Sequence, residues 1–578
     1  MHKFNDFLTM LDGYLGGNVW FMVLLIGTGF FFTIYLGFPQ IRYFRHAIRI
    51  TKGKYDHSHD IGDTSHFQSL ARALSGTVGT GNIAGVALAI HLGGPAALFW
   101  MLLTAAIGMC TKMVEVSISH KYRDILPDGS VSGGPMYYMK KRLNITTRKG
   151  KVIRTGLILG SFFAGATILC SFGTGSLPQI NSISNAVFTT FGIRHIVTGA
   201  ILSVVLALII IGGIRRIAKV TSVLVPFMAI LYLIGSLIVI FSNYQNILPS
   251  LGAIFGDAFT GSAAAGGFLG ASFAFAMNRG VNRGLFSNES GQGSAPIAHS
   301  AARAPEPISE GMVALLEPFI DTICICTLTG LVVLSSGAWN TKTENHFQTT
   351  DMQYVVGSFD DSRSGDVARL GDHVRGTAPL PLFTGRLDVE NGVVKNQGVS
   401  LIHARSLAEN VRYNAGNAPF TGVIDVKNGK LTNPAGFDII GESLIHSAPM
   451  TTFAFSRSIM KGWGKYIVAF GLLLFAFSTA ISWSYYGDRA VTFLAGPKYV
   501  IWYRIIFVVA FFIASFTDTT IIWSLSYIAI VLMAVPNLIG ILLLRKEMKQ
   551  SVKDYWLTFA KQYPDEKISG KMLKRFNR

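Results

Sequence analysis

Apolar runs long enough to cross a bilayer recur along the whole chain, from residues 19–37 to residues 521–544. A transmembrane helix needs about 17 to 25 mostly apolar residues. Here 50% of the 578 residues are hydrophobic and only 14% are charged. Because backbone groups in lipid must find their hydrogen bonds within the protein, such a chain folds as a bundle of helices. The sequence therefore predicts an all-α polytopic membrane protein.

We predict eleven transmembrane helices, at 18–37, 67–90, 95–120, 155–190, 195–213, 218–241, 262–280, 311–338, 464–486, 499–516 and 519–544. The fourth is long enough to contain a break. Lys and Arg gather in alternate short loops and in the carboxy-terminal tail, and such loops face the cytoplasm. This pattern predicts an outside N-terminus and a cytoplasmic C-terminus, and we expect the membrane to be a bacterial plasma (inner) membrane. It also explains the net charge of +18, so we exclude a nucleic-acid partner.

Other chemical classes find little support in the sequence. The four cysteines lie inside apolar segments, where a thiol is usually a small buried hydrophobe: Cys110, Cys170, Cys324 and Cys326. The glycine-rich stretches "GSVSGGP" and "GQGSAP" lack the strand-to-helix context and the lysine of a phosphate loop. The amino-terminal segment lacks a cleavage signal, so the first helix is expected to be retained. We predict no enzyme activity, no cofactor and no metal centre other than a coupling ion.

A polar, β-prone segment interrupts the spans at 340–460 and predicts an extracytoplasmic domain. Within it "PLFTGRLDVENGVVKN" is echoed about 37 residues later by "APFTGVIDVKNGKLTN". Each copy carries an Asn-Gly pair, which predicts a β-hairpin. The role of this insertion stays open between decoration, gating and binding an unknown partner. The chain thus divides into 1–66 (extra helix and loop), 67–241 (first repeat), 262–339 (start of the second repeat), 340–460 (insertion), 461–544 (end of the second repeat) and 545–578 (basic tail).

The second predicted span contains four glycines that lower its helix stability, in "SGTVGTGNIAGV", residues 75–86. A glycine in a helix interior costs about 1 kcal/mol relative to alanine. One explanation is close helix packing, which the spacing of Gly81 and Gly85 fits. The other is a binding site, since oxygen-bearing side chains stand among the glycines and hard cations prefer oxygen ligands. We favour the site.

Symmetry supports the site. Without the first span, ten remain, and the second set of five opens with glycines at Gly266, Gly267 and Gly270. Five is an odd number, so the second set must run with inverted topology. Glycine-interrupted segments at corresponding places in two inverted halves mark a transporter's binding site. The amino ends of half-helices there offer N–H groups to an anion such as a carboxylate.

Ionisable residues inside the predicted spans are further candidates. Glu317 stands near the cytoplasmic end, so we expect it to be solvated or paired with an arginine. Asp321, one turn deeper, is a weak candidate for an ion site or a gate. Lys112 and Glu115 are expected to pair with each other.

Six blocks of sequence stand in order along nearly all the spans: "ALSGTVGTGNIAGVALAIHLGGPAALFWM", "GMCTKMVEVSISHKYR", "SGGPMYYM", "RGLFSNESGQGSAPIAHSAA", "FIDTICICTLTGL" and "LFAFSTAISWSYYGDRA". Together they resemble the alanine or glycine:cation symporter family, within the amino acid-polyamine-organocation superfamily. The resemblance does not cover the segment from about residue 340 to residue 460. It implies the five-plus-five inverted repeat of the bacterial leucine transporter, with two broken helices and here one extra amino-terminal helix. It also implies Na⁺-coupled uptake of a small neutral amino acid, alanine or glycine.

The resemblance also implies roles for individual residues. Amides near Gly79, Thr80 and Gly81 would hold the substrate carboxylate, and Gln179 would lie beside its amine. Trp483, Gly270 and Phe273 would close the pocket. Na⁺ would be bound by oxygens of Ser75, Thr77, Val78, Asn82, Ser478 and Thr479. Each has a structural alternative, because Ser and Thr usually bond back to their own helix, and Gln179 or Trp483 could serve packing alone.

The expected function is therefore secondary transport, with Na⁺, a small neutral amino acid and the lipid bilayer as partners. One alternative replaces Na⁺ by H⁺, and Asp321 should then matter more than Ser478 and Thr479. Another is a membrane receptor whose insertion binds a partner and whose helical core senses a ligand.

Overall fold

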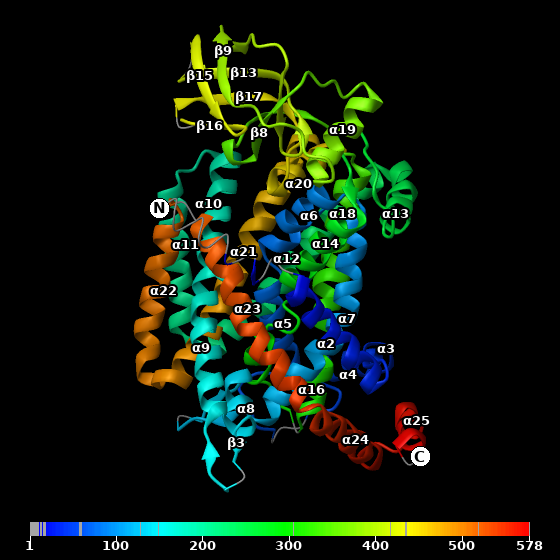
Figure 1. The fold of residues 1–578 in the computed structure, drawn as a ribbon. Coiled ribbons are helices and arrows are strands. Elements are labelled where there is room, and N and C mark those ends of the chain that lie inside the picture. The colour runs from blue at the N-terminus through cyan, green and yellow to red at the C-terminus, as the bar shows by residue number, and fades with distance from the viewer. Residues whose placement is uncertain are drawn as a thin grey trace.

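The computed structural model describes residues 11, 14–15, 19–56, 60–127, 129–147, 149–304, 306–416, 418–433, 436–517 and 520–576. The expectation for the amino-terminal residues 1–10 lies outside them. Figure 1 shows a bundle of helices with a β-rich domain at one end, which we call the insertion end. Helices α8 (Pro135–Arg142), α24 (Arg545–Gln562) and α25 (Lys567–Phe576) lie at the opposite, tail end.

The bundle is built from long apolar helices, several of them in two pieces. In chain order these are α2 (Val19–Leu36), α5 (His66–Thr77), η1 (Gly81–Gly85), α6 (Val86–Gly93), α7 (Ala96–Lys121), α9 (Thr155–Gly173), α10 (Leu177–Phe191), α11 (His195–Ile211), α12 (Gly213–Ser242), α14 (Phe273–Asn288), α16 (Pro307–Ala314), α17 (Leu316–Pro318), η3 (Phe319–Cys326), α18 (Thr327–Ser335), α21 (Gly464–Ala495), α22 (Val500–Ala514) and α23 (Thr520–Leu543). Shorter helices connect them: α3 (Pro39–Arg42), α4 (Phe44–Thr51), α13 (Ile247–Gly256), α15 (Ala295–His299) and α20 (Ser447–Ser456).

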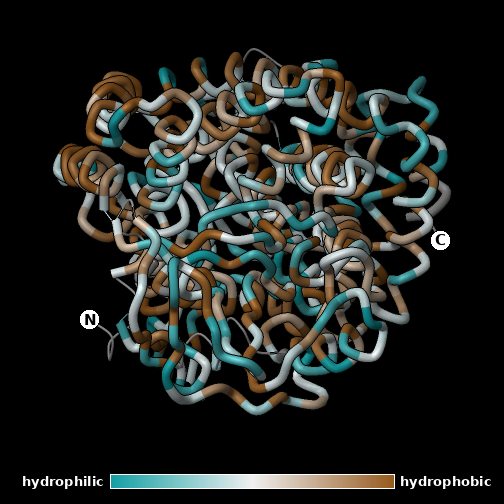
Figure 2. The backbone as a smooth tube through the Cα atoms, turned by 90° about the horizontal axis from the view of Figure 1, so that it is seen from above, coloured by the Kyte–Doolittle hydropathy of each residue, from teal (hydrophilic) through white to brown (hydrophobic). Residues whose placement is uncertain are grey.

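In the described part of the chain, six helices are long and apolar enough to cross a membrane, or eight if each bent pair is one span. The helices Trp20–Leu36 and His195–Ile211 are apolar but shorter. Figure 2 shows apolar helices at the margin of the bundle. On α11, for example, Ile201, Val204 and Leu208 are about 60% exposed and share one face, as expected of a lipid-facing helix. The chain is a multi-pass membrane protein, whereas the count of eleven spans, the inverted repeat and the orientation stay predictions.

The first predicted helix break is present. Helix α5 begins with a capping box between Ser65 and Gln68 and ends at Thr77, and the chain bends by 55° before it continues as η1 and α6. The predicted fourth span is also broken, between α9 and α10.

The predicted position of the second break is wrong. Gly266 and Gly270 have φ angles of 57° and 88° and lie in a loop held by the short hairpin β5 (Gly261–Ser262) and β6 (Ala271–Ser272). Helix α14 begins only after it, with the Ser272 hydroxyl as cap. Glycine there supplies left-handed turns before a helix and not a break within one. The chain leaves the helix instead at residues 289–294, between α14 and α15.

The β-rich domain contains two hairpins that pair with each other. Strands β9 (Gly385–Glu390) and β10 (Val393–Val394) turn at Asn391–Gly392, and β15 (Gly422–Lys427) and β16 (Lys430–Leu431) turn at Asn428–Gly429. They form one sheet in the order β10-β9-β15-β16. Two further sheets, β12-β11-β8 and β14-β13-β17-β7, contain β7 (Thr343–His346), β8 (Met352–Val356), β11 (Val399–His403), β12 (Ser406–Leu407), β13 (Glu409–Ala415), β14 (Ala418–Pro419) and β17 (Asp438–Ser443). Helix α19 (Ser364–Arg375) packs beside them, while β1 (Asp124–Ile125), β2 (Val131–Ser132), β3 (Ile145–Thr146) and β4 (Val152–Ile153) form two hairpins near the tail end.

Helix α7 lies against both α14 and α16, and glycines allow the close approach. A Cβ atom on Gly280 would overlap the carbonyl oxygen of Ala97, and one on Gly311 would lie 2.7 Å from that of Met113. Because backbone atoms cannot yield as a side chain can, these positions fix how near the helices come to each other.

We therefore expect Gly311→Ala to destabilise the bundle by roughly 1–3 kcal/mol through overpacking. Gly165 is a matched control, since it lies in α9 with no heavy atom within 4 Å of an added Cβ. Gly165→Ala should be neutral or stabilising, by up to about 1 kcal/mol. Thermal unfolding in detergent measures both, and equal midpoints for the two variants would contradict the packing described.

Candidate functional site

The break after α5 frees backbone amides, and the side chains of Asn82 and Gln179 accept their hydrogen bonds. The last regular bond of α5 runs from Val78 N to the carbonyl of Leu74 over 2.7 Å. Gly79 N then donates to Asn82 Oδ1 over 2.9 Å, and Thr80 N donates to Gln179 Oε1 over 3.4 Å. Two side-chain carbonyl oxygens thus occupy the positions that an anionic group would take at this break.

Helix α21 brings two hydroxyl groups to the same place. Ser75 Oγ donates to the carbonyl of Ser478 over 2.7 Å, Ser478 Oγ reaches the carbonyl of Ser75 over 3.4 Å, and Thr479 Oγ1 reaches that of Val78 over 3.4 Å. Both hydroxyls also bond to the carbonyl of Phe475, at 2.8 Å and 3.0 Å. Ser75, Val78, Ser478 and Thr479 are all buried. This cluster of neutral oxygens suits a hard cation such as Na⁺.

Gly79 lies directly against Thr479 of α21 and Gln179 of α10. A Cβ atom there would lie 2.6 Å from Thr479 Oγ1 and 3.5 Å from Gln179 Oε1. At Gly81 the nearest atom would be a ring carbon of Phe286, 3.7 Å away. Only the first of these two glycines is therefore required by the close approach of the three elements.

Asn82 links the break to a buried carboxylate. Its Nδ2 donates to Asp321 Oδ1 over 2.6 Å. Asp321 Oδ2 accepts from the hydroxyls of Ser287, over 2.8 Å, and Thr322, over 2.7 Å. The Thr329 hydroxyl donates to the carbonyl of Asn82 over 2.8 Å. Helices α14 and α18 and the segment η3 thereby hold the Asn82 side chain with its oxygen toward Gly79.

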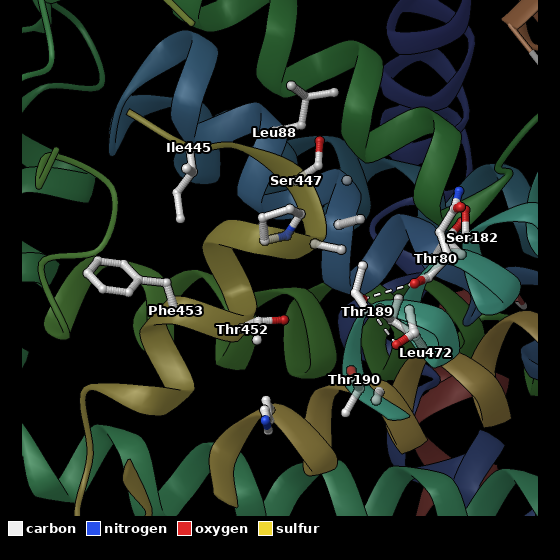
Figure 3. Close-up of a pocket in the computed structure, with 18 of the residues that line it drawn as sticks. Thr80, Leu88, Ser182, Thr189, Thr190, Ile445, Ser447, Thr452, Phe453 and Leu472 are labelled. Carbon is white, nitrogen blue, oxygen red and sulfur yellow. Dashed lines mark hydrogen bonds between the residues drawn. The ribbon is translucent and has the colours of Figure 1, made fainter. Parts of the chain in front are cut away.

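A cavity of about 1010 Å³, which we call the entrance cavity, leads from this break toward the insertion end. Thr80 and Gly81 of the break line it together with residues of η1, α6, α10, α14, α20, α21 and β7. Figure 3 shows Thr80, Ser182 and Leu472 on one side and Ile445 and Phe453 on the other. The break is therefore accessible from the insertion end of the bundle.

Four predicted site residues lie apart from this cluster. The Thr77 hydroxyl bonds back to the carbonyls of Ala73 and Leu74. Gly270 lies in the β5–β6 loop, and Phe273 packs against Trp100 with ring centroids 5.7 Å apart. Trp483 is buried, and its Nε1 donates to Glu289 Oε1 over 3.2 Å. The structure brings together Ser75, Val78, Gly79, Thr80, Gly81, Asn82, Gln179, Ser478 and Thr479, with Asp321 behind them.

A chain of buried ionisable groups, which we call the ionic chain, runs from the tail end into the bundle. His66 lies 3.6 Å from Asp56 and also contacts Glu310. Glu310 contacts His299, whose Nε2 lies 2.6 Å from Glu317. Glu317 Oε2 then lies 3.1 Å from Lys112 Nζ. Apart from Asp56, these side chains are at most 3% exposed.

The ionic chain corrects two sequence expectations. Glu317 is neither solvated nor paired with arginine, and the salt bridge of Lys112 is to Glu317 and not to Glu115. Glu115 accepts hydrogen bonds from Gly291 N and Gly293 N, at the second break. The pairing depends on how α7, α15 and α17 pack, so spacing along one helix could not reveal it. The sequence patterns did not lead to three members of the ionic chain, His66, His299 and Glu310. The signal that could have found them is the presence of histidines and acids within membrane segments.

The model of the sodium:alanine symporter family matches residues 1–362 and 435–568. The chain belongs to the sodium:alanine symporter family. This is a family of transporters, which confirms the expectation that the chain is not an enzyme and supports Na⁺-coupled amino acid symport.

Three relatives of this symporter chain align over nearly the whole length. The sodium/alanine symporter AgcS of Methanococcus maripaludis is 35% identical, covering 93% of this chain and 95% of the relative. An uncharacterized transporter of Haemophilus influenzae is 34% identical, covering 95% of both. The putative sodium/proton-dependent alanine carrier protein YrbD of Bacillus subtilis is 30% identical, covering 95% of this chain and 92% of the relative. A solved manganese transporter of Eremococcus coleocola covers 90% of this chain and 99% of its own at 11% identity, but its TM-score of 0.39 does not establish a shared fold.

The family model leaves out residues 363–434. These residues contain α19 and most strands of the β-rich domain. The residues of the break, of α21 and of the ionic chain all lie within the matched part.

The hydrogen bonds at Asp321 lead to a test of stability. Asp321→Ala leaves Asn82, Ser287 and Thr322 without their buried acceptor, so we expect the free energy of unfolding to fall by roughly 2–4 kcal/mol. Asp321→Asn keeps a carbonyl oxygen at the same place and should cost less. Thermal unfolding of the two variants beside the wild type measures this order, and an unchanged midpoint for Asp321→Ala would contradict these contacts.

Proposed function

We propose that the protein is a Na⁺-coupled symporter of a small neutral amino acid, alanine or glycine, which it carries into the cell. One observation carries this proposal. The amides of Gly79 and Thr80, which the break frees, lie beside the buried hydroxyl oxygens of Ser478 and Thr479. An amino acid offers a carboxylate to the first group, and Na⁺ is a ligand for the second.

In this proposal the substrate carboxylate replaces side-chain oxygens at the break. The carboxylate accepts hydrogen bonds from the amides of Gly79, Thr80 and Gly81. The side-chain oxygens of Asn82 and Gln179 then move away from these amides. The Gln179 oxygen then faces the substrate ammonium group. The Asn82 oxygen becomes available to a cation, so that binding of the substrate and binding of the cation favour each other.

The Na⁺ site would consist of the carbonyl oxygens of Ser75 and Val78 and the hydroxyl oxygens of Ser478 and Thr479, with the freed Asn82 oxygen as a further candidate ligand. When the cation binds, each hydroxyl turns its proton outward and offers a lone pair. A cation here bridges α5 and α21, and it therefore couples ion binding to the relative position of these two helices. This arrangement of the site does not use the remaining predicted residues, Thr77, Trp483, Gly270 and Phe273.

The driving force has a simple upper bound. One Na⁺ moving down a potential of ~100 mV supplies ~2.3 kcal/mol, and a tenfold concentration gradient adds ~1.4 kcal/mol. The sum of ~3.7 kcal/mol supports accumulation of at most a few hundred-fold for each coupled ion. With the insertion end outside the cell, the entrance cavity would admit substrate from the outside.

H⁺ is a second candidate for the coupling ion. The ionic chain links Asp56 at the tail end to Lys112 inside the bundle through alternating histidines and glutamates, and such chains carry protons in other transporters. One relative bears the name sodium/proton-dependent alanine carrier.

Uptake of labelled alanine into proteoliposomes tests the proposal. We expect an inward Na⁺ gradient to stimulate uptake, and Thr479→Ala to reduce that stimulation at least about tenfold because a cation ligand is lost. Ser482→Ala is the matched control. Ser482 lies on the same helix, one turn further on, and donates to the carbonyl of Arg72 over 2.9 Å, so its loss tests helix packing alone.

Uptake driven by a pH gradient but not by Na⁺, retained in Thr479→Ala and lost in Asp321→Asn, would replace Na⁺ by H⁺ in this account. No stimulated uptake with either ion, across a panel of small amino acids, would overturn the transport proposal itself.

The two glycines of the break should differ in the same assay. Gly79→Ala forces Thr479 away from the carbonyl of Val78, so we expect Na⁺-stimulated uptake to fall at least about tenfold. Gly81→Ala meets only Phe286 at 3.7 Å and should keep most of the activity. Equal effects of the two substitutions would argue against a site at Gly79.

A further inference from the structure

A second cavity, of about 630 Å³, lies between α4 and α25, and we call it the tail cavity. Five cationic side chains line it: Arg42 of α3, Arg45 and Arg49 of α4, and Lys567 and Lys571 of α25. No acidic residue is among the described residues that line it. The tail cavity shares no residue with the entrance cavity, so it is a separate and strongly positive site.

The carboxy-terminal tail folds back onto α4, and this contact forms the tail cavity. His46 Nε2 lies 2.6 Å from the hydroxyl oxygen of Tyr555, in α24. Glu566, the residue before α25, lies with its Oε2 2.7 Å from Arg49 Nη1, and it also contacts Lys54. These contacts hold the beginning of α25 beside α4.

Four of the five cations have no acidic partner to balance them. Arg49 pairs with Glu566. The other four are exposed and form no salt bridge with a described residue: Arg42, Arg45, Lys567 and Lys571. Like charges gathered at one place repel each other, and an anion between them relieves the repulsion. Charge complementarity therefore favours an anionic occupant.

The tail cavity also has apolar walls. Ile41 and Phe44 line it from the side of α3 and α4, and Ile568 and Met572 line it from α25. Ile41 is 74% exposed. A small inorganic anion makes no use of apolar walls, whereas a phospholipid joins a charged phosphate to an apolar body. The combination of cations and apolar side chains therefore favours a lipid.

An exposed apolar stripe on α2 leads toward the tail cavity. Val23, Phe30 and Ile34 are 55–59% exposed, and their spacing places them on one face of the helix. Helix α3 begins directly after α2, at Pro39, and it carries Ile41 into the wall of the cavity. Figure 1 shows α3 and α4 at the margin of the bundle and α25 at its tail end.

We propose that the tail cavity binds the headgroup of an anionic phospholipid, whose acyl chains lie along the exposed face of α2. The phosphate group would lie among the four cations without an acidic partner. Clusters of Lys and Arg next to a membrane helix attract anionic lipids, and the tail end is the predicted cytoplasmic side. The lipid would join α25 to α4 and so fix the tail on the bundle. This site uses no residue of the break, so the inference does not rest on the proposed function.

Native mass spectrometry of the full chain in detergent, titrated with dioleoyl phosphatidylglycerol, tests the proposal. We expect the wild type to bind this anionic lipid at least about tenfold more tightly than dioleoyl phosphatidylcholine, which has no net charge. Arg45→Gln/Lys571→Gln should weaken the binding of phosphatidylglycerol at least about tenfold, because one cation is lost from each wall. Arg45→Lys/Lys571→Arg keeps both charges and should retain the affinity.

The matched control removes two cations elsewhere. Lys151, between β3 and β4, and Lys498, between α21 and α22, are exposed, belong to loops predicted to be cytoplasmic and do not line the tail cavity. Lys151→Gln/Lys498→Gln changes the net charge equally and should keep the affinity of the wild type. Thermal unfolding verifies that every variant is folded.

Inorganic phosphate distinguishes a lipid site from a site for a free anion. At the same concentration as the lipid it should not displace phosphatidylglycerol, and displacement would assign the tail cavity to a free anion and overturn the proposal. Equal affinity for the two lipids, or an equal loss of affinity in the two double glutamine variants, would overturn it as well. None of these outcomes depends on transport, so a failure here leaves the proposed function standing, and the reverse also holds.

Discussion

The backbone of a helix that stops inside a membrane must find new hydrogen-bond partners, and the arrangement of the site follows from this requirement. A buried amide without a partner costs roughly 1–3 kcal/mol. At the break after α5, Asn82 and Gln179 supply the missing acceptors for Gly79 and Thr80. Substrate binding in our proposal is therefore an exchange of acceptors, in which a carboxylate replaces two neutral oxygens at amides already in position.

The two ends of the bundle differ in a way that suits alternating access. The entrance cavity reaches the break from the insertion end, whereas buried ion pairs join α5, α7, α15, α16 and α17 toward the tail end. Removing one partner of such a buried pair leaves an uncompensated charge and is strongly destabilising. The ionic chain thus ties these helices together toward the tail end, while the entrance cavity reaches the break from the insertion end.

How far the sequence predicts this site depends on whether its signal is local. The first break could be predicted, because glycines and oxygen-bearing side chains stand together in residues 75–86 and the chain does bend there. The second could not be placed, since Gly266 and Gly270 give the same composition in a loop outside any helix.

The salt bridge of Lys112 to Glu317 joins residues far apart in the chain, and no periodicity reveals such a pair. The contact of the Arg405 guanidinium group with the Phe275 ring likewise follows from how the β-rich domain sits on α14. What the sequence expresses as a local pattern was predictable, and what only packing creates was not.

The central claim is the exchange of acceptors at the break, and a structure determined by cryo-electron microscopy with alanine and Na⁺ bound tests it most directly. The account predicts the alanine carboxylate within hydrogen-bond distance of the amides of Gly79 and Thr80, with Asn82 Oδ1 and Gln179 Oε1 withdrawn from them. Alanine bound elsewhere, or bound while both side-chain oxygens keep their amides, would contradict it.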